Sequence, residues 1–475
     1  MNLIYKVKDK PGFGKTLIFA LQQVLAILAA TIAVPAIIGN DMSQSAALFG
    51  AGVGTLVYLC FTKFRSPVFL GSSFAFIGSM FAAFGGAISA QAGYAGLILG
   101  AIFAGLVYVI IAIVVKFAGV KWINKIMPAV VIGPTVAIIG LSLAGNAVGD
   151  MTVGKVGHYV TQVVLQDGVQ VGDPSSVFIS HASVYLCLVC ALVTLFTVII
   201  CSVFGKKMGK LIPFIIGIAA GYIVATILTL IGNAAGSDAL KIIDFNAFKD
   251  MKIFAVPDFT FLNAFKGLKE INAEYIATIA AAYIPVAFVV FAEHIADHKN
   301  LSSIIGSDLL EDPGLHRTLL GDGVGSMAGA FFGGCPNTTY GESIGCVAIT
   351  GNASVITILT TACLCIGISF FGPFVTFLAS IPNCVMGGVC VTLYGFIAVS
   401  GLKMIQKTDL NKNGNLFTVA VILICGVGGL AVSFGDVKIT TVACALILGI
   451  ITNLIVRKRT SKEEEAEKVE AKIEE

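Results

Sequence analysis

The sequence predicts an all-α polytopic membrane protein with fourteen membrane-spanning segments. Of its 475 residues, 57% are hydrophobic and only 12% are charged, whereas a soluble domain carries about 25% charged residues. The charged residues fall between long apolar runs, and the 53 glycines suit helices that pack closely in lipid. Motifs shared by the two halves of the chain predict that the segments form an inverted repeat of seven plus seven.

Twelve apolar runs are long enough to be whole membrane-spanning helices, which need roughly 20 residues each. They lie near residues 16–39, 45–62, 94–115, 127–147, 179–204, 211–232, 272–296, 316–334, 353–378, 384–402, 415–434 and 438–456. Two further runs, 66–87 and 335–351, contain glycines and polar residues, so we expect them to cross the membrane as broken segments. In chain order these two are the third and the tenth segment.

The distribution of Lys and Arg predicts the orientation, because short cytoplasmic loops are enriched in both. Basic residues occupy the N-terminus, the turns after the second, fourth, sixth, eighth and twelfth segments, and the C-terminal end. We therefore expect both termini in the cytoplasm, with a solvated cytoplasmic tail over residues 459–475. Residues 236–271 also contain lysines but follow the seventh segment. We expect an extracellular loop there, since long translocated loops obey the rule poorly.

Short motifs recur in the same order in both halves. Residues 127–133 (MPAVVIG) resemble residues 381–387 (IPNCVMG), and residues 52–55 (GVGT) resemble residues 323–326 (GVGS). A broken segment follows the second kind of match in each half. Seven segments per half, an odd number, place the two halves in opposite orientations. Interrupted segments at corresponding positions are a sequence sign of the substrate site of a transporter.

Both broken segments contain residues that favour extended backbone beside glycines: residues 72–74 (SSF) and residues 338–340 (TTY). We expect a short β-strand in each, one from either half. Two such strands would pair with each other and satisfy backbone groups that lipid leaves unpaired. The residues leave one alternative open, a pair of kinked helices whose Ser and Thr side chains bond to their own backbone.

Ionisable residues inside membrane-spanning segments are candidates for a functional site. Glu342 is the one carboxylate of the tenth segment, and Glu293 follows a long apolar run in the eighth. Glu293 and Asp297 lie four residues apart and share one helical face, while His294 and His298 share the neighbouring face. For Asp297 and His298 a position at the helix end stays open beside a functional role. No His-Glu-x-x-His order is present, so we expect no metal.

Two carboxylates from opposite halves suit a small neutral ligand with several N–H groups, because a carboxylate only accepts hydrogen bonds. A carboxyl group enclosed in a cavity of low dielectric constant can also take up and release a proton near neutral pH. Glu293 and Glu342 are therefore candidates for substrate binding, and Glu293, Asp297 and His298 are candidates for proton coupling. We expect no enzyme, since no nucleophile–base pair or metal-ligand set has a suitable spacing, and no cofactor besides the proton.

Several further strings resemble those of one transporter family. They are residues 21–23 (LQQ), 70–77 (LGSSFAFI), 292–295 (AEHI), 312–317 (DPGLHR), 336–342 (PNTTYGE), 382 and 385–389 (P and VMGGV). On these residues the chain resembles the nucleobase/ascorbate transporter family, and within it the bacterial uracil permeases. The similarity spans nearly the whole chain, and the string from Asn337 to Glu342 is its most specific part.

The resemblance implies two domains that move against each other. A core domain would comprise residues 1–120 and 272–380, and a gate domain residues 121–235 and 381–458. The resemblance also implies a substrate site in which carboxylates and backbone groups hold the base and aromatic rings wall it. These residues are Ser73, Phe74, Glu293, Tyr340, Gly341, Glu342, Ser343 and Tyr394.

The function implied by the resemblance is proton-coupled uracil symport across the plasma membrane by alternating access. Membrane lipid and a possible homodimer partner are implied, and no nucleic acid. A xanthine or other purine nucleobase carrier of the same family is the first alternative. An anion carrier of the same fold is less expected, because two carboxylates repel an anion.

Three residues depart from the family pattern. Ser343 stands where Asn is usual, Gln23 stands where His is common, and Asp297 stands where the uracil permeases have His. Some xanthine carriers share the Asp, so the residues leave xanthine open as a substrate. The proton-handling group stays open among Asp297, His298 and Glu293.

Overall fold

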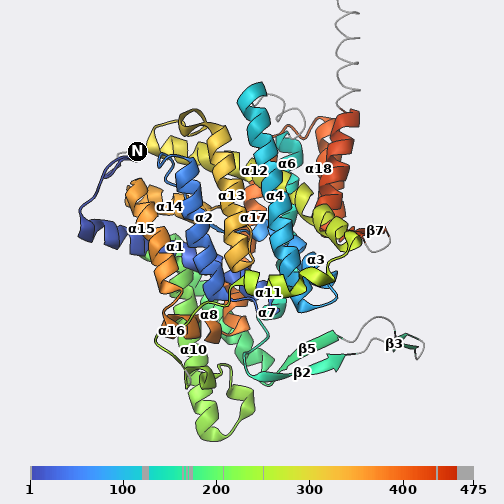
Figure 1. Ribbon diagram of the computed structural model, residues 1–475. Coiled ribbons are helices and arrows are strands. Elements are labelled where there is room, and N and C mark those ends of the chain that lie inside the picture. The colour runs from blue at the N-terminus through green and yellow to red at the C-terminus, as the bar shows by residue number, and fades with distance from the viewer. Residues whose placement is uncertain are drawn as a thin grey trace, which may run out of the picture. The chain divides into compact units, whose positions relative to one another are not determined.

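The computed structural model describes residues 3–119, 128–162, 165–166, 169–170, 175–206, 208–249, 251–434 and 437–456. The predicted tail over residues 459–475 lies outside them. The described chain is mostly helical (Figure 1). Within those ranges, eight helices are long and apolar enough to cross a membrane, which makes this a multi-pass membrane protein.

The eight helices coincide with predicted spans. They are α1 (Phe13–Ile38), α2 (Gln44–Phe61), α4 (Ala90–Ala118), α6 with α7 (Ala129–Asp150), α8 (Val184–Phe204), α10 (Pro213–Ala235), α12 (Ala273–Ile305) and α17 (Asn383–Gln406). The other predicted runs contain the less apolar α13 (Leu315–Gly333) and several shorter helices. The shorter helices are η1 with α3 (Phe74–Gly85), α14 (Gly341–Thr350), α15 (Val355–Ile368), α16 (Gly372–Ser380), α18 (Asn413–Val427) and Thr441–Val456. The number of crossings stays a prediction.

Two predicted spans are shorter than expected. Residues 353–378 form two helices, α15 and α16, because Pro373 lacks the N–H group that a continuous helix requires and instead lies in the first turn of α16. Residues 415–434 are helical only to Val427. Gly429 then takes φ +76°, and β7 (Val432–Phe434) pairs with β8 (Val437–Ile439) in an antiparallel hairpin.

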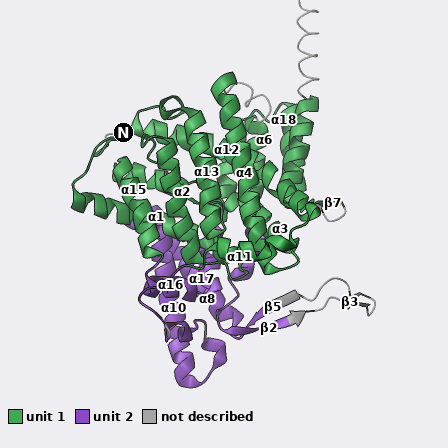
Figure 2. Ribbon diagram, viewed as in Figure 1, with its two compact units in different colours: residues 1–142, 257–369, 394–475 green, residues 143–256, 370–393 purple. Residues whose placement is uncertain are grey.

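The chain divides into two compact units (Figure 2). Unit 1 comprises Met1–Ser142, Pro257–Ser369 and Tyr394–Glu475, and unit 2 comprises Leu143–Val256 and Phe370–Leu393. The predicted core and gate domains are defined by their motion relative to each other. The division into two compact units does not describe motion, so the core and gate domains stay a prediction.

In unit 2, helices α8 and α10 pack against each other. A Cβ atom on Gly217 of α10 would lie 3.0 Å from the Thr194 carbonyl oxygen of α8, so glycine permits the close approach. The remaining short elements are α9 (Met208–Leu211), η2 (Asp238–Leu240), η3 (Phe245–Phe248), and the antiparallel pairs β2 (Gly157–Gln162) with β5 (Ser175–Ser180) and β3 (Leu165–Gln166) with β4 (Val169–Gln170).

In unit 1, α13 packs between α2 and α4, and the three helices run side by side in Figure 1. The backbones of α2 and α13 meet at two glycines of the repeated motif. A Cβ atom on Gly54 would lie 2.7 Å from the Gly325 carbonyl oxygen, and a Cβ atom on Gly325 would lie 2.7 Å from the Gly54 carbonyl oxygen. The two copies of the motif therefore contact each other directly and reciprocally. The predicted extracellular loop ends in unit 1 with α11 (Thr260–Gly267) and η4 (Leu268–Glu270), and η5 (Leu310–Gly314) leads into α13.

Candidate functional site

The two broken segments meet as a short antiparallel ribbon. Strand β1 (Leu70–Ser72) pairs with β6 (Asn337–Thr339), with Gly71 opposite Thr338. The Ser73 N–H group donates to the Pro336 carbonyl oxygen at 2.9 Å, which extends the pairing by one step. The prediction of two paired strands is confirmed, and the alternative of two kinked helices is wrong. Gly71 is required here because a Cβ atom would overlap the Tyr340 ring.

Both strands lead directly into helices. β1 continues through η1 (Phe74–Phe76) into α3 (Ile77–Gly85), and β6 continues through Tyr340 into α14. The first turns of η1 and α14 therefore lie at the ribbon, and their first N–H groups have no partner within the helix. These N–H groups carry partial positive charge, which favours an anionic group or a carbonyl oxygen nearby. Glu342 lies in the first turn of α14.

The predicted carboxylates lie together beside this ribbon. Glu293 of α12 is half-buried, and α12 packs against both β6 and α14, whose first turn contains Glu342. Within the described ranges, neither Glu293 nor Glu342 forms a salt bridge. Gly341 is exposed, with open space where a side chain would begin. The arrangement is a group of hydrogen-bond acceptors next to an open volume.

Asp297 connects α12 to the ribbon. The Thr339 hydroxyl of β6 donates a hydrogen bond to Asp297 Oδ2 at 2.6 Å. Asp297 thus lies on the same helical face as Glu293, as predicted, and holds that face against strand β6. Its role in proton coupling stays a prediction.

His298 is fully buried, and both of its ring nitrogens have partners. Nδ1 lies 2.8 Å from the His294 carbonyl oxygen, so Nδ1 must be the donor. Nε2 lies 2.7 Å from the Tyr58 hydroxyl, which lies 2.7 Å from the Ser66 hydroxyl. The helix continues past His298 to Ile305, so this residue does not lie at the helix end.

A buried pair that the sequence reasoning missed lies beside these residues. Asp322 Oδ2 of α13 lies 2.6 Å from His294 Nδ1, and the Thr318 hydroxyl lies 3.0 Å from His294 Nε2. The rings of His294 and His298 stack with centroids 4.0 Å apart. The signal in the sequence was a lone carboxylate, Asp322, within the apolar run at 316–334, the same signal that singled out Glu342.

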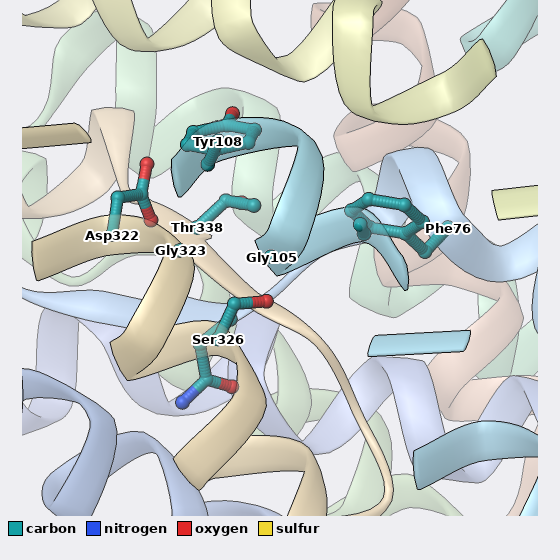
Figure 3. Close-up of a pocket in the computed structure, with 9 residues that line it drawn as sticks. Phe76, Gly105, Tyr108, Asp322, Gly323, Ser326 and Thr338 are labelled. Atoms are coloured by element: carbon teal, nitrogen blue, oxygen red, sulfur yellow. The ribbon is translucent and has the colours of Figure 1, made fainter. Parts of the chain in front are cut away.

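A small cavity adjoins this pair. Asp322, Tyr108, Ser326 and Thr338 are among the residues that line it (Figure 3). Its volume of about 10 Å³ is close to the minimum that holds one water molecule. Asp322 Oδ1 and the Tyr108 hydroxyl are buried and have no hydrogen-bond partner among the residues that the structure describes. Two such atoms are the kind of partners that a buried water molecule needs.

The predicted aromatic residues differ in exposure. Phe74 is half-buried, and its ring meets the Tyr394 ring edge-on with centroids 6.0 Å apart. Tyr340 is buried, and its hydroxyl donates to the Ser72 carbonyl oxygen at 2.8 Å. Phe74 is thus the ring with surface left to contact a ligand, and Tyr340 braces the ribbon. The buried Ser73 contributes its backbone to that ribbon.

Two of the residues that depart from the family pattern contact each other. Gln23 Nε2 of α1 donates to the Ser343 hydroxyl and lies 3.3 Å from the Ser343 carbonyl oxygen. Both side chains are buried. The Ser343 side chain is therefore engaged by α1, and a contact between Ser343 and substrate stays a prediction.

Comparisons with known proteins agree on a transporter. A family model described as "Permease family" matches residues 14–434. Uracil permeases of Bacillus caldolyticus and Bacillus subtilis (strain 168) are each 37% identical, over 96% and 97% of this chain and 95% and 96% of their own. The uracil permease of Escherichia coli (strain K12) is 33% identical over 94% of this chain and 93% of its own.

Two solved structures share the fold at low sequence identity. The transmembrane domain of the cyanobacterial bicarbonate transporter BicA matches with a TM-score of 0.59 and 15% identity, covering 95% of this chain and all of that one. The murine anion transporter Slc26a9, in its inward-facing state, matches with a TM-score of 0.61 and 14% identity, covering 96% of this chain and 70% of that one.

Proposed function

Because the chain belongs to this permease family, the nucleobase/ascorbate transporters, we propose that it is a proton-coupled uracil symporter that works by alternating access. It is a permease rather than an enzyme. Its relatives named uracil permease align with it over almost their whole length, which supports the same substrate here.

The observation that carries the proposal is that α12, which bears Glu293, packs against β6 and α14, which bears Glu342, beside the exposed Gly341. Uracil has ring N–H groups that donate hydrogen bonds and carbonyl oxygens that accept them. Carboxylates accept the first, and the N–H groups at the starts of η1 and α14, which have no partner within their own helices, donate to the second. The half-buried Phe74 ring offers a face or edge to the planar base.

We propose fourteen crossings in a seven-plus-seven inverted repeat, with both termini cytoplasmic in the plasma membrane. Two contacts support the repeat, since each joins corresponding residues of the two halves: Gly54 with Gly325, and β1 with β6. Such self-complementary contacts are what a two-fold relation between the halves produces. The core and gate domains, and a homodimer, complete the architecture that we propose.

Proton coupling would use Glu293 and its neighbours. Glu293, Asp297 and Glu342 lie close together with no cation paired to Glu293 or Glu342 among the described residues, so adding one proton relieves the repulsion between like charges. Asp297, tied to β6, and His298 are the other proposed participants.

Transport of labelled uracil into proteoliposomes tests this function. Uptake should rise when the interior is made alkaline relative to the outside and fall when a protonophore collapses that gradient. Equal uptake with and without the gradient would overturn the coupling, and no uptake of uracil would overturn the substrate.

Xanthine is the second candidate substrate, because Asp297 stands where some xanthine carriers have the same residue. Unlabelled xanthine in excess should leave uracil uptake unchanged if the chain is a uracil permease. Competition at concentrations similar to those of uracil itself would favour the purine carrier instead.

A further inference from the structure

A basic pocket opens where α4 ends and α13 begins. The two helices pack side by side, and the last turns of α4 and the first turns of α13 line a pocket of about 270 Å³. Lys116, His316 and Arg317 provide its basic groups, and none of its lining residues is acidic. Its other lining residues are apolar and include Ile113 and Phe117.

The basic groups lie close together and are not neutralised nearby. Lys116, His316 and Arg317 all line the same pocket. Within the described ranges, neither Lys116 nor Arg317 forms a salt bridge, and the nearby Asp312 is paired with Arg65 at 2.7 Å. The pocket therefore has an excess of positive charge.

The apolar side of the pocket faces outward from the helix. Phe117 is 80% exposed and Ile113 is 51% exposed, and both lie on a helix that is apolar enough to span a membrane. The Lys116 ammonium lies 5.7 Å from the centre of the Phe117 ring, within reach of a cation–π interaction. Positive charge and an exposed apolar surface thus adjoin at the end of a membrane-spanning helix.

An occupant that matches both the basic groups and the exposed apolar side chains must be an anion with a hydrophobic tail. A free phosphate ion would neutralise the basic groups but leave Ile113 and Phe117 uncovered. Basic pockets between helix ends on the cytoplasmic side of a membrane bind phospholipid head groups. The orientation proposed above places this end of α4 at the cytoplasmic leaflet.

We propose that this pocket binds an anionic phospholipid, with its phosphate between Lys116 and Arg317 and its acyl chains along Ile113 and Phe117. The His316 ring has an N–H group that can donate a further hydrogen bond to the head group. The pocket shares no residue with the Glu293–Glu342 site, so loss of uracil transport and loss of lipid binding are separate results.

Native mass spectrometry of the purified full chain in detergent tests the proposal, with phosphatidylglycerol and phosphatidylcholine as probes. The wild type should bind phosphatidylglycerol more tightly. A basic residue near an anionic lipid surface contributes about 1 kcal/mol, so Lys116→Gln or Arg317→Gln should reduce that preference about fivefold. The double variant should reduce it about 30-fold, and Lys116→Arg should restore it.

The matched control is Lys403→Gln with Lys407→Gln, two exposed lysines that do not line the pocket. This variant should keep the wild-type preference. An unchanged preference in the Lys116/Arg317 double variant would overturn the proposal, as would equal binding of the two lipids by the wild type.

Inorganic phosphate separates a lipid site from an ion site. Phe117→Ala should weaken phosphatidylglycerol binding, and millimolar phosphate should displace little of the lipid. Complete displacement by phosphate together with no effect of Phe117→Ala would identify a site for the free anion and overturn the assignment to lipid.

Discussion

His294 Nδ1 and Asp322 Oδ2 lie 2.6 Å apart in a region where both side chains are almost fully excluded from solvent. His294 also contacts the Thr318 hydroxyl, and the pair adjoins the cavity that Tyr108 lines. A polar contact thus joins helices α12 and α13. Because it is buried, water cannot replace the hydrogen-bond partner if one of the two side chains is removed.

Asp322→Ala should therefore lower the stability of the protein strongly. Removing one partner of a buried pair leaves the other polar group unpaired, which costs about 1–3 kcal/mol. Asp322→Asn keeps an oxygen that can accept from His294 Nδ1 and should retain more of the stability. The midpoint of thermal unfolding in detergent measures both. An Asp322→Ala midpoint equal to that of the wild type would show that the contact does not contribute.

Glu342→Gln should reduce uracil affinity by about 10- to 100-fold, the equivalent of losing one hydrogen bond to a charged acceptor. The amide would also place an N–H group opposite the N–H groups of the base, and two donors cannot form a hydrogen bond with each other. Saturation of labelled uracil uptake in proteoliposomes gives the measurement. Glu311→Gln, in an exposed position outside the site, is the control and should transport normally. Normal uptake by Glu342→Gln would remove Glu342 from the proposed site.

Gln23 and Ser343 should behave as one unit, because the amide of the first donates to the hydroxyl of the second. Gln23→His or Ser343→Asn alone replaces one partner of a buried contact and should impair uptake. The double variant, which installs the residues usual in the family, should recover part of the loss. The coupling energy of a contacting pair is about 0.5–3 kcal/mol. Strictly additive effects in the four-protein cycle would contradict this expectation.

Gly54→Ala should destabilise the protein, since its Cβ atom would lie 2.7 Å from the Gly325 carbonyl oxygen. Overpacking of a close contact costs about 1–3 kcal/mol. Gly395→Ala on α17 is the matched control: no atom lies within 4 Å of its added Cβ, and alanine favours the helix by about 1 kcal/mol. Thermal midpoints should move in opposite directions. A fall of equal size in both variants would indicate a general effect of replacing glycine.

The sequence predicted the elements that depend on local pattern and repetition. The apolar runs identified the helices, and the recurrence of a broken segment in each half identified β1 and β6 as partners. Glu293 and Glu342 were recognised because a carboxylate inside an apolar membrane segment is energetically costly and usually has a functional role.

Contacts that depend on the packing of distant helices were not predictable. The partner of His294 is Asp322 of the following helix, and the two meet in a fold in which α12 and α13 both pack against α4. The contact between Gln23 and Ser343 joins residues 320 positions apart, so no local pattern reveals it. The sequence Gly372-Pro373 marks the break between α15 and α16. The apolar residues on either side nevertheless led to the prediction of one continuous span.

The ribbon of β1 and β6 has a consequence for biosynthesis. Ser72 pairs with Asn337, so β1 is made more than 260 residues before its partner exists. Until then its backbone groups lack their partner strand, and an unpaired backbone group in hydrocarbon costs several kcal/mol. The nascent strand β1 must therefore remain near water or the insertion machinery while the six segments predicted between residues 94 and 334 are made. The proposed substrate site accordingly forms only after β6 has been made, and a ribosome that stops before residue 337 leaves a chain that lacks the ribbon on which this site depends.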